Sequence, residues 1–262
     1  MSELEAIILG FVQGLTEFLP VSSSGHLTIG KEILGIESSN LTFEVVVHAA
    51  TVSSTIVVFW KEIISLLKGF FKFRMNEETG YLLKIAVSMI PVFIIGMFFK
   101  DQVEALFGSG LLVVGISLLI TATLLMLTGI IKPKERPLTY KDSFIIGIAQ
   151  AVAVLPGLSR SGATISTGMM LGIKKEDVAK FSFLMVLVPV LGEAFLELMS
   201  GEFSVASAEM NSLPLILGFI SAFISGLFAC KFMIAIVKRA KLKYFAVYCA
   251  VAGLLCFASL LF

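Results

Sequence analysis

Two short polar clusters carry the residues of this chain that are best suited to chemistry. In the first, Gln13 and Glu17 are four residues apart, so on a helix their side chains share one face. Serines and a glycine follow at 22–25, and His26 comes where we expect a second helix to begin. A helix start preceded by small hydroxyl residues directs backbone N–H groups toward an anion. This cluster therefore combines a carboxylate, an imidazole and hydroxyl groups with an anion-binding turn.

The second cluster, residues 156–164, has a similar turn and adds a cation. Arg160 stands between two serines, and a guanidinium can bind two phosphate oxygens at once. Together the clusters suit a phosphorylated group that enters from water while its hydrocarbon part stays in lipid. The residues that we expect to bind such a group are Gln13, Ser22, Ser24, Ser159, Ser161, Gly162 and Thr164.

Structural explanations compete with these functional ones. Arg160 could form an ion pair with Glu17 that supports the fold, and such a pair could also open onto a ligand. His26 could be an ordinary residue of a helix start, and any of the serines at 22–24 could simply cap that helix.

Further ionisable groups lie in apolar segments, where each costs about 2.5–3.5 kcal/mol and is a functional candidate. Glu44 and His48 are four residues apart, and we expect these two side chains to pair with each other. Glu193 and Glu197 lie near the outer end of a predicted span, where we expect them to reach the interface.

The composition places both clusters in a membrane. Of the 262 residues, 57% are hydrophobic and 15% are charged, whereas a soluble domain is about 45–50% apolar and about 25% charged. A soluble protein of this size would lack polar side chains to cover its surface, so we exclude a soluble enzyme and a disordered chain. A net charge of +1 without a basic tail excludes nucleic-acid binding. We predict an all-α polytopic membrane protein.

Six apolar segments are predicted to cross the bilayer, because a span needs about 20 apolar residues. They are residues 41–60, 82–99, 111–131, 178–199, 212–236 and 244–262. The two clusters interrupt two further apolar stretches, 4–30 and 143–172. Each half of these stretches is too short to cross, so we predict two re-entrant helical hairpins whose broken tips lie inside the membrane.

The two halves of the chain resemble each other. Gln13 aligns with Gln150, and Gly25 with Gly162, both at an offset of 137 residues. Each unit holds one hairpin and three spans, and because three is odd, the second unit must be inverted. We predict a single membrane domain built as an inverted repeat, residues 1–135 and 140–262, with its polar site near the midplane.

The positions of lysine and arginine predict the orientation, because cytoplasmic loops carry an excess of both. If the first hairpin enters from outside, the 20 Lys and Arg residues all fall in inner loops except Lys31, Lys100 and Arg160. We therefore expect both termini to face outward.

Both clusters resemble the signatures of one family. Residues 13–26, QGLTEFLPVSSSGH, resemble the (E/Q)xxxE-FLPVSS-x-GH signature of bacterial undecaprenyl-diphosphate phosphatases of the bacitracin-resistance type. Residues 156–164, PGLSRSGAT, resemble the PGxSRSxxT signature of that family, and the resemblance covers the whole chain. Many members have Glu where this chain has Gln13, which leaves one carboxylate in the pair and weakens a metal site of two carboxylates.

The resemblance implies an enzyme of the bacterial inner membrane whose pocket opens outward. It would remove the terminal phosphate from undecaprenyl diphosphate and so recycle the lipid carrier for cell-wall synthesis. Bacitracin would compete for that substrate, which explains the resistance. Glu17, Ser23, His26 and Arg160 would be catalytic, with Ser23, His26 or water as the nucleophile. A divalent cation, Mg²⁺ or Ca²⁺, is implied as the cofactor, with Glu17 as its protein ligand.

The main alternative is a transporter, because inverted repeats with facing broken helices recur in secondary transporters. The same pocket could carry an isoprenoid phosphate across the bilayer. A scaffold in a wall-synthesis complex is a third alternative, which predicts that polar substitutions at both tips leave function intact. A homodimer is an open alternative to a monomer.

Overall fold

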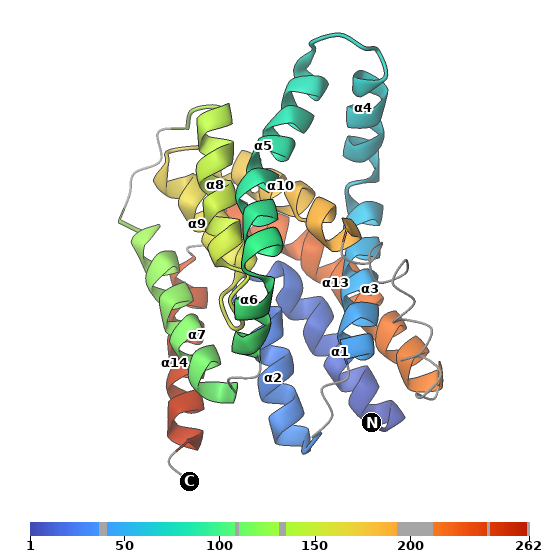
Figure 1. Ribbon diagram of the computed structural model, residues 1–262, viewed down its shortest axis with the longest axis vertical. Helices are drawn as coiled ribbons and strands as arrows, with labels where there is room; N and C mark the ends of the chain where they lie inside the picture. The colour runs from blue at the N-terminus through green and yellow to red at the C-terminus, as the bar shows by residue number, and fades with distance from the viewer. Residues whose placement is uncertain (37–40, 108–109, 131–134, 193–211, 240–241, 261–262) are drawn as a thin grey trace.

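The described part of the chain is helical. The computed structural model describes residues 1–36, 41–107, 110–130, 135–192, 212–239 and 242–260 (Figure 1). Within these ranges the only strand-like pairing is one isolated bridge between Arg136 and Ile173, so the predicted all-α class is confirmed. The helices are α1 (Glu3–Phe18), α2 (Ser23–Leu34), α3 (Leu41–Val58), α4 (Trp60–Phe70), α5 (Glu77–Phe98), α6 (Lys100–Phe107), α7 (Gly110–Leu127), α8 (Tyr140–Val152), α9 (Arg160–Met170), α10 (Lys175–Met185), α13 (Ser212–Arg239) and α14 (Lys243–Ser259).

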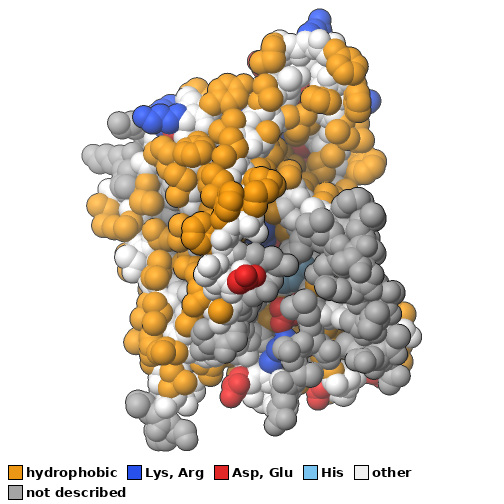
Figure 2. Space-filling view, in the orientation of Figure 1, with side chains coloured by type: hydrophobic (Ala, Val, Ile, Leu, Met, Phe, Trp, Pro, Cys, Tyr) orange, Lys and Arg blue, Asp and Glu red, His pale blue; other side chains and the backbone are white. Residues whose placement is uncertain are grey.

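Long apolar helices and an apolar surface mark a multi-pass membrane protein. The helix α5, the helix α7 and the segment Ser212–Ile236 of α13 are long and apolar enough to cross a bilayer. The helices α3 and α4 make a fourth span if they are counted together, although they are bent by 75°. Apolar side chains cover much of the described surface in Figure 2, as expected of helices that face lipid.

That six segments cross the membrane stays a prediction. The helix α14 is apolar but has 17 residues, fewer than a straight crossing requires. The predicted span 178–199 begins in α10, and its residues 193–199 lie outside the described ranges.

The first apolar stretch breaks where the sequence predicts. The helix α1 ends at Phe18, and α2 begins at Ser23. Pro20 lacks the N–H group that a continuing helix needs, and Ser22 Oγ caps α2 by accepting a hydrogen bond from Gly25 N at 3.2 Å. Ser22 has a φ of +72°, a value that residues with a side chain rarely adopt. The chain therefore turns back, and α2 packs against α1.

The second stretch breaks in the same way. The helix α8 ends at Val152, α9 begins at Arg160, and Ser159 Oγ caps α9 by accepting from Gly162 N at 3.0 Å. Between the two helices Gly157 has a φ of +83°. A Cβ atom on Gly157 would lie 2.7 Å from the Cα atom of Val114 on α7, so only glycine fits between this tip and α7.

Helices from each half of the chain pack on helices from the other half. The helix α1 packs along α13, where a Cβ atom on Gly10 would lie 2.4 Å from the carbonyl oxygen of Gly218. The helix α8 packs along α5, where a Cβ atom on Gly147 would lie 2.3 Å from the carbonyl oxygen of Ser88. Gly10 and Gly147, which align in sequence, thus both allow two backbones to approach closely.

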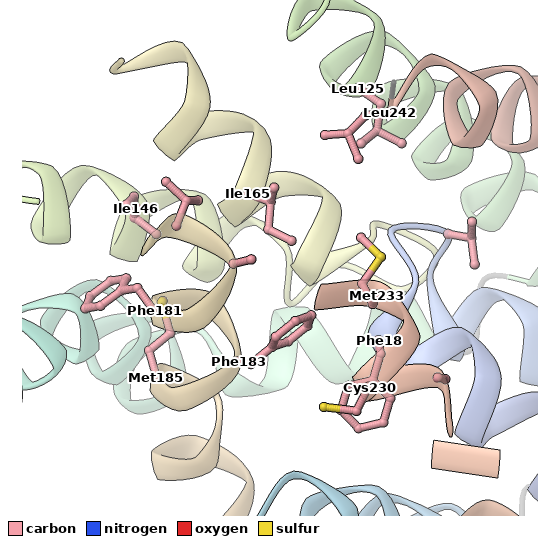
Figure 3. Close-up of a cluster of buried hydrophobic side chains, with 14 of the residues drawn as sticks. Phe18, Leu125, Ile146, Ile165, Phe181, Phe183, Met185, Cys230, Met233 and Leu242 are labelled. Carbon is pink, nitrogen blue, oxygen red and sulfur yellow. The ribbon is translucent and has the colours of Figure 1, made fainter. Parts of the chain in front are cut away.

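The main apolar core lies directly beside the first tip. Phe18, the last residue of α1, packs edge-on against Phe183 of α10, with ring centroids 5.9 Å apart. Figure 3 shows these two rings near Met233 and Cys230 of α13. Because Phe18 follows Glu17, this packing fixes the end of α1 and hence the position of the Glu17 carboxylate.

Candidate functional site

The two tips are joined by two hydrogen bonds, each of which a serine side chain makes to the backbone of the other tip. Ser24 Oγ of the first tip accepts from Gly157 N of the second at 3.3 Å. Ser161 Oγ of the second tip donates to the Leu19 carbonyl of the first at 3.1 Å. Ser24 and Ser161 are 137 residues apart, the offset of the sequence alignment. The predicted meeting of the tips is therefore present, and each tip contributes one serine to it.

Glu17 lies at the centre of the site. Its Oε1 atom forms a salt bridge with Arg160, which comes from the second tip. Its Oε2 atom accepts hydrogen bonds from Ser23 Oγ at 2.6 Å and from Gln13 Nε2 at 3.0 Å. The Glu17 side chain is only 9% exposed and that of Arg160 is 27% exposed, so the guanidinium offsets the cost of burying the carboxylate. Four of the predicted site residues thus come together.

His26 does not contact this carboxylate. Its Nδ1 atom lies 2.8 Å from the carbonyl oxygen of Ser22, and its Nε2 atom lies 2.6 Å from the hydroxyl of Tyr248 on α14. Both ring nitrogens are therefore engaged by groups other than Glu17, Ser23 and Arg160. Tyr248 was not predicted as a site residue, because nothing in the sequence pattern relates α14 to the first tip.

The imidazole next to Glu17 belongs to His48 instead. His48 Nε2 lies 3.8 Å from Glu17 Oε2, and His48 Nδ1 donates to the Glu44 carbonyl at 2.8 Å. The Glu44 carboxylate pairs with Lys31 of α2. The predicted pairing of the Glu44 and His48 side chains is therefore wrong. The Lys31 ammonium of α2 gives Glu44 a full positive charge as its partner, which a spacing of four residues on one helix does not reveal.

The remaining residues of the second tip support its backbone. Ser159 caps α9 through Gly162 N, and Thr164 Oγ1 lies 2.6 Å from Ser182 Oγ on α10. Ser159 and Thr164 are each 1% exposed, and Ser161 is 7% exposed. In this conformation they hold Arg160 in place, and their predicted contact with phosphate stays a prediction. Glu193 and Glu197 lie outside the described residues.

A small cavity adjoins the ion pair. Its volume is about 20 Å³, enough for about one water molecule. Glu17, Arg160 and Ser161 line it together with Thr51, Thr55 and Ser182. A phosphate group is larger than one water molecule, so a phosphorylated ligand is expected to enter this cavity only when the Glu17–Arg160 pair separates. In Figure 2, basic, acidic and histidine side chains are visible together near the middle of the face.

Known proteins are similar in sequence to this chain over nearly its full length. Residues 6–255 match the family described as bacitracin resistance protein BacA. The chain belongs to this family. Relatives named undecaprenyl-diphosphatase are 58% identical in Bacteroides thetaiotaomicron, with 97% of each chain covered, and 58% identical in Parabacteroides distasonis, with 100% of this chain and 99% of the relative covered. A relative with the same name in Oceanobacillus iheyensis is 38% identical over 95% of this chain and 93% of its own length.

The side chains that could act as metal ligands limit how this member of the bacitracin-resistance family could bind a cation. Within the described ranges no three His, Cys, Asp or Glu side chains gather to hold a metal ion. Glu17 supplies the one carboxylate at the tips, while Gln13 Oε1 is buried and has no hydrogen-bond partner. The residues at the tips therefore do not fit a metal site in which the protein supplies all the ligands. A Mg²⁺ ion that is bound mainly by phosphate oxygens needs only one or two carboxylates from the protein. The Glu17 carboxylate and the Gln13 amide oxygen fit this requirement.

Proposed function

We propose that the protein is an integral membrane phosphatase that hydrolyses undecaprenyl diphosphate to undecaprenyl phosphate and inorganic phosphate. The observation that carries the proposal is the arrangement around Glu17, where Ser23 Oγ and the Arg160 guanidinium from opposite tips bind one carboxylate. The names of relatives at 57–58% identity support the same reaction. The reaction returns the lipid carrier to cell-wall synthesis and confers resistance to bacitracin, which binds the same diphosphate.

Ser23 is the nucleophile that the geometry favours. Its hydroxyl already donates to Glu17 Oε2 at 2.6 Å, so Glu17 can take the proton as Ser23 Oγ bonds to the terminal phosphorus. The bond from that phosphorus to the bridging oxygen breaks, and the proton passes from Glu17 to the departing lipid phosphate. Glu17 then takes a proton from the water that attacks the phosphoserine and returns it to Ser23 Oγ as inorganic phosphate leaves. His26 is the less favoured nucleophile, because both its ring nitrogens are engaged elsewhere.

Arg160 supplies the charge for this reaction. When the diphosphate enters, its oxygens replace Glu17 Oε1 as the partner of the guanidinium, which can bind two phosphate oxygens side by side. The same movement frees Glu17 to act as a base. Phosphoryl transfer depends mainly on such positioning and on stabilising charge on the phosphoryl oxygens.

A divalent cation, Mg²⁺ or Ca²⁺, belongs to this proposal as a partner of the substrate. When bound, it would neutralise part of the charge of the diphosphate. Glu17 and Gln13 Oε1 would provide its protein oxygens, and phosphate and water the others. Chelation with EDTA is expected to lower phosphate release, and addition of Mg²⁺ or Ca²⁺ to restore it.

The membrane arrangement completes the proposal. Six spans and two re-entrant hairpins would form an inverted repeat, with the termini and the pocket facing outward. The support is that α1 packs on α13 of the second half while α8 packs on α5 of the first. The exchanged serine contacts, from Ser24 to Gly157 and from Ser161 to Leu19, support it further.

Phosphate release by the purified protein tests the function. A prenyl diphosphate of 15 or more carbons is supplied in detergent, and inorganic phosphate is measured for wild type and Glu17→Gln. We expect hydrolysis by the wild type and its loss in the variant. Movement of the lipid across liposomes without hydrolysis would instead support the transporter, which the names of the relatives do not favour.

A further inference from the structure

His26 is held by a residue from the other end of the chain. The hydroxyl of Tyr248 lies 2.6 Å from His26 Nε2, although the two residues are 222 positions apart. The two rings also stack, with centroids 5.5 Å apart and planes only 11° from parallel. Tyr248 therefore restrains both the direction and the plane of the imidazole.

The hydrogen bonds define one protonation pattern. The Ser22 carbonyl oxygen can only accept, so His26 Nδ1 carries a proton. In the neutral imidazole Nε2 then has a free electron pair, and it accepts a hydrogen bond from the Tyr248 hydroxyl. The Ser22 carbonyl thus selects the tautomer, and the Tyr248 hydroxyl binds the ring from the opposite side.

This restraint extends to the serine at the centre of the site. Ser22, which accepts from His26, is also the cap of α2 and directly precedes Ser23. The neighbour of Tyr248, Cys249, donates through its Sγ atom to the Pro20 carbonyl at 3.5 Å. Two consecutive residues of α14 therefore hold the first tip on either side of Ser22.

We propose that Tyr248 is a positioning residue for hydrolysis that acts through His26. By holding the direction and the plane of the imidazole, it keeps the carbonyl of Ser22, and with it the Ser23 hydroxyl, in place when the diphosphate binds. This inference rests on the proposed phosphatase function. A tyrosine hydroxyl in an apolar environment needs a hydrogen-bond partner in any case, so the test must separate positioning from simple structural support.

Tyr248→Phe is the first variant, because it keeps the stacked ring and removes only the hydroxyl. We expect kcat to fall about tenfold, the effect of losing one hydrogen bond that positions the site, and KM to change less than about twofold. The matched control is Tyr244→Phe, one turn earlier on α14. Tyr244 is 67% exposed, and the Lys243 ammonium lies 5.4 Å from its ring centroid. The control is expected to keep wild-type kcat and KM.

A double mutant distinguishes action through His26 from a general effect. If Tyr248 acts through His26, adding Tyr248→Phe to His26→Ala lowers kcat no further than His26→Ala alone. Independent, multiplied losses would overturn the inference, as would wild-type kcat in Tyr248→Phe or in His26→Ala. The melting temperature is measured on the same samples, and an activity loss that merely follows a lower folded fraction would also overturn it. Absence of hydrolysis by the wild type would instead contradict the proposed function.

Discussion

At the scale of single residues, Glu17 connects the two tips and the neighbouring helices. Its carboxylate forms a salt bridge with Arg160, accepts hydrogen bonds from Ser23 and Gln13, and lies near the His48 ring. The interactions of Glu17 with these partners differ in strength. The guanidinium pair and the short serine hydrogen bond are direct contacts, whereas His48 Nε2 stands 3.8 Å away, beyond hydrogen-bonding distance. Substitutions of these partners should therefore differ in effect.

The distance of His48 predicts a modest effect of its removal. We expect His48→Ala to lower kcat/KM by about tenfold or less, because a contact without a hydrogen bond is worth about 1 kcal/mol. The value is measured by phosphate release beside Glu17→Gln, for which a much greater loss is expected. Equal losses in the two variants would show that His48 takes part directly in the reaction.

Ser22 provides a test of backbone conformation at the tip. Its φ of +72° costs about 1–3 kcal/mol in a residue with a side chain, and glycine avoids that cost. Replacing a serine cap by glycine loses only a few tenths of a kcal/mol, whereas alanine loses about 1 kcal/mol. We therefore expect Ser22→Gly to melt at a higher temperature than Ser22→Ala. The reverse order would contradict the strained geometry.

At the scale of helices, close backbone contacts hold the tips in register. The helices α1 and α8 end in the tips, and each reaches its partner through an aligned glycine, Gly10 or Gly147. The N-cap serines then begin α2 and α9 with the same hydrogen bond, from Gly25 N to Ser22 and from Gly162 N to Ser159. The site thus depends on how far apart these helices lie.

Gly147→Ala tests the close contact between α8 and α5. Its Cβ atom would meet the Ser88 carbonyl at 2.3 Å, so the helices must separate, at a cost of about 1–3 kcal/mol. The matched control is Gly96→Ala on α5, where nothing lies within 4 Å of the added atom. We expect a lower melting temperature for Gly147→Ala and an unchanged or higher one for the control. Equal melting temperatures would mean that α8 and α5 do not approach so closely.

At the scale of the whole molecule, one ion pair ties the segment between the two halves to the second hairpin. Arg136 donates to both carboxylate oxygens of Asp142, at 2.6 and 2.7 Å, and through Nε to the Leu171 carbonyl at 3.2 Å. The Arg136 hydrogen bonds lower the pKa of Asp142 from an ordinary 3.8 to about 2, and Thr139 adds to the effect. Asp142 lies just before the predicted hairpin, at the start of α8.

This lowered pKa predicts a pH-dependent contribution to stability. The unfolded chain binds a proton at Asp142 near pH 3.8 and the folded protein only near pH 2. The contribution is therefore complete above about pH 5 and is lost as the pH falls from about 4 to about 2. We expect the melting temperature of wild type to fall more steeply over that interval than that of Asp142→Asn. Parallel curves would contradict the role of the pair.

Local chemistry made part of this fold predictable. Pro20 and the serine caps break the helices where the sequence indicates, and the i to i+4 spacing of Gln13 and Glu17 gives the observed hydrogen bond. The partners of His26 and Glu44 were not predictable, because Tyr248 and Lys31 come from other helices. Spacing within one helix shows which residues share a face, whereas the helix that covers this face depends on tertiary packing.

The most direct test of the account is phosphate release by Arg160→Ala, because Arg160 is the one cation that the second tip brings to Glu17. Loss of the partner of a buried carboxylate destabilises by about 3–5 kcal/mol, so the folded fraction is measured in parallel. The control is Lys180→Ala, which removes an exposed pair with Glu62 at 4.0 Å and should change little. We predict that folded Arg160→Ala protein loses about a thousandfold or more in kcat/KM. Near-wild-type turnover by the folded variant would contradict the account.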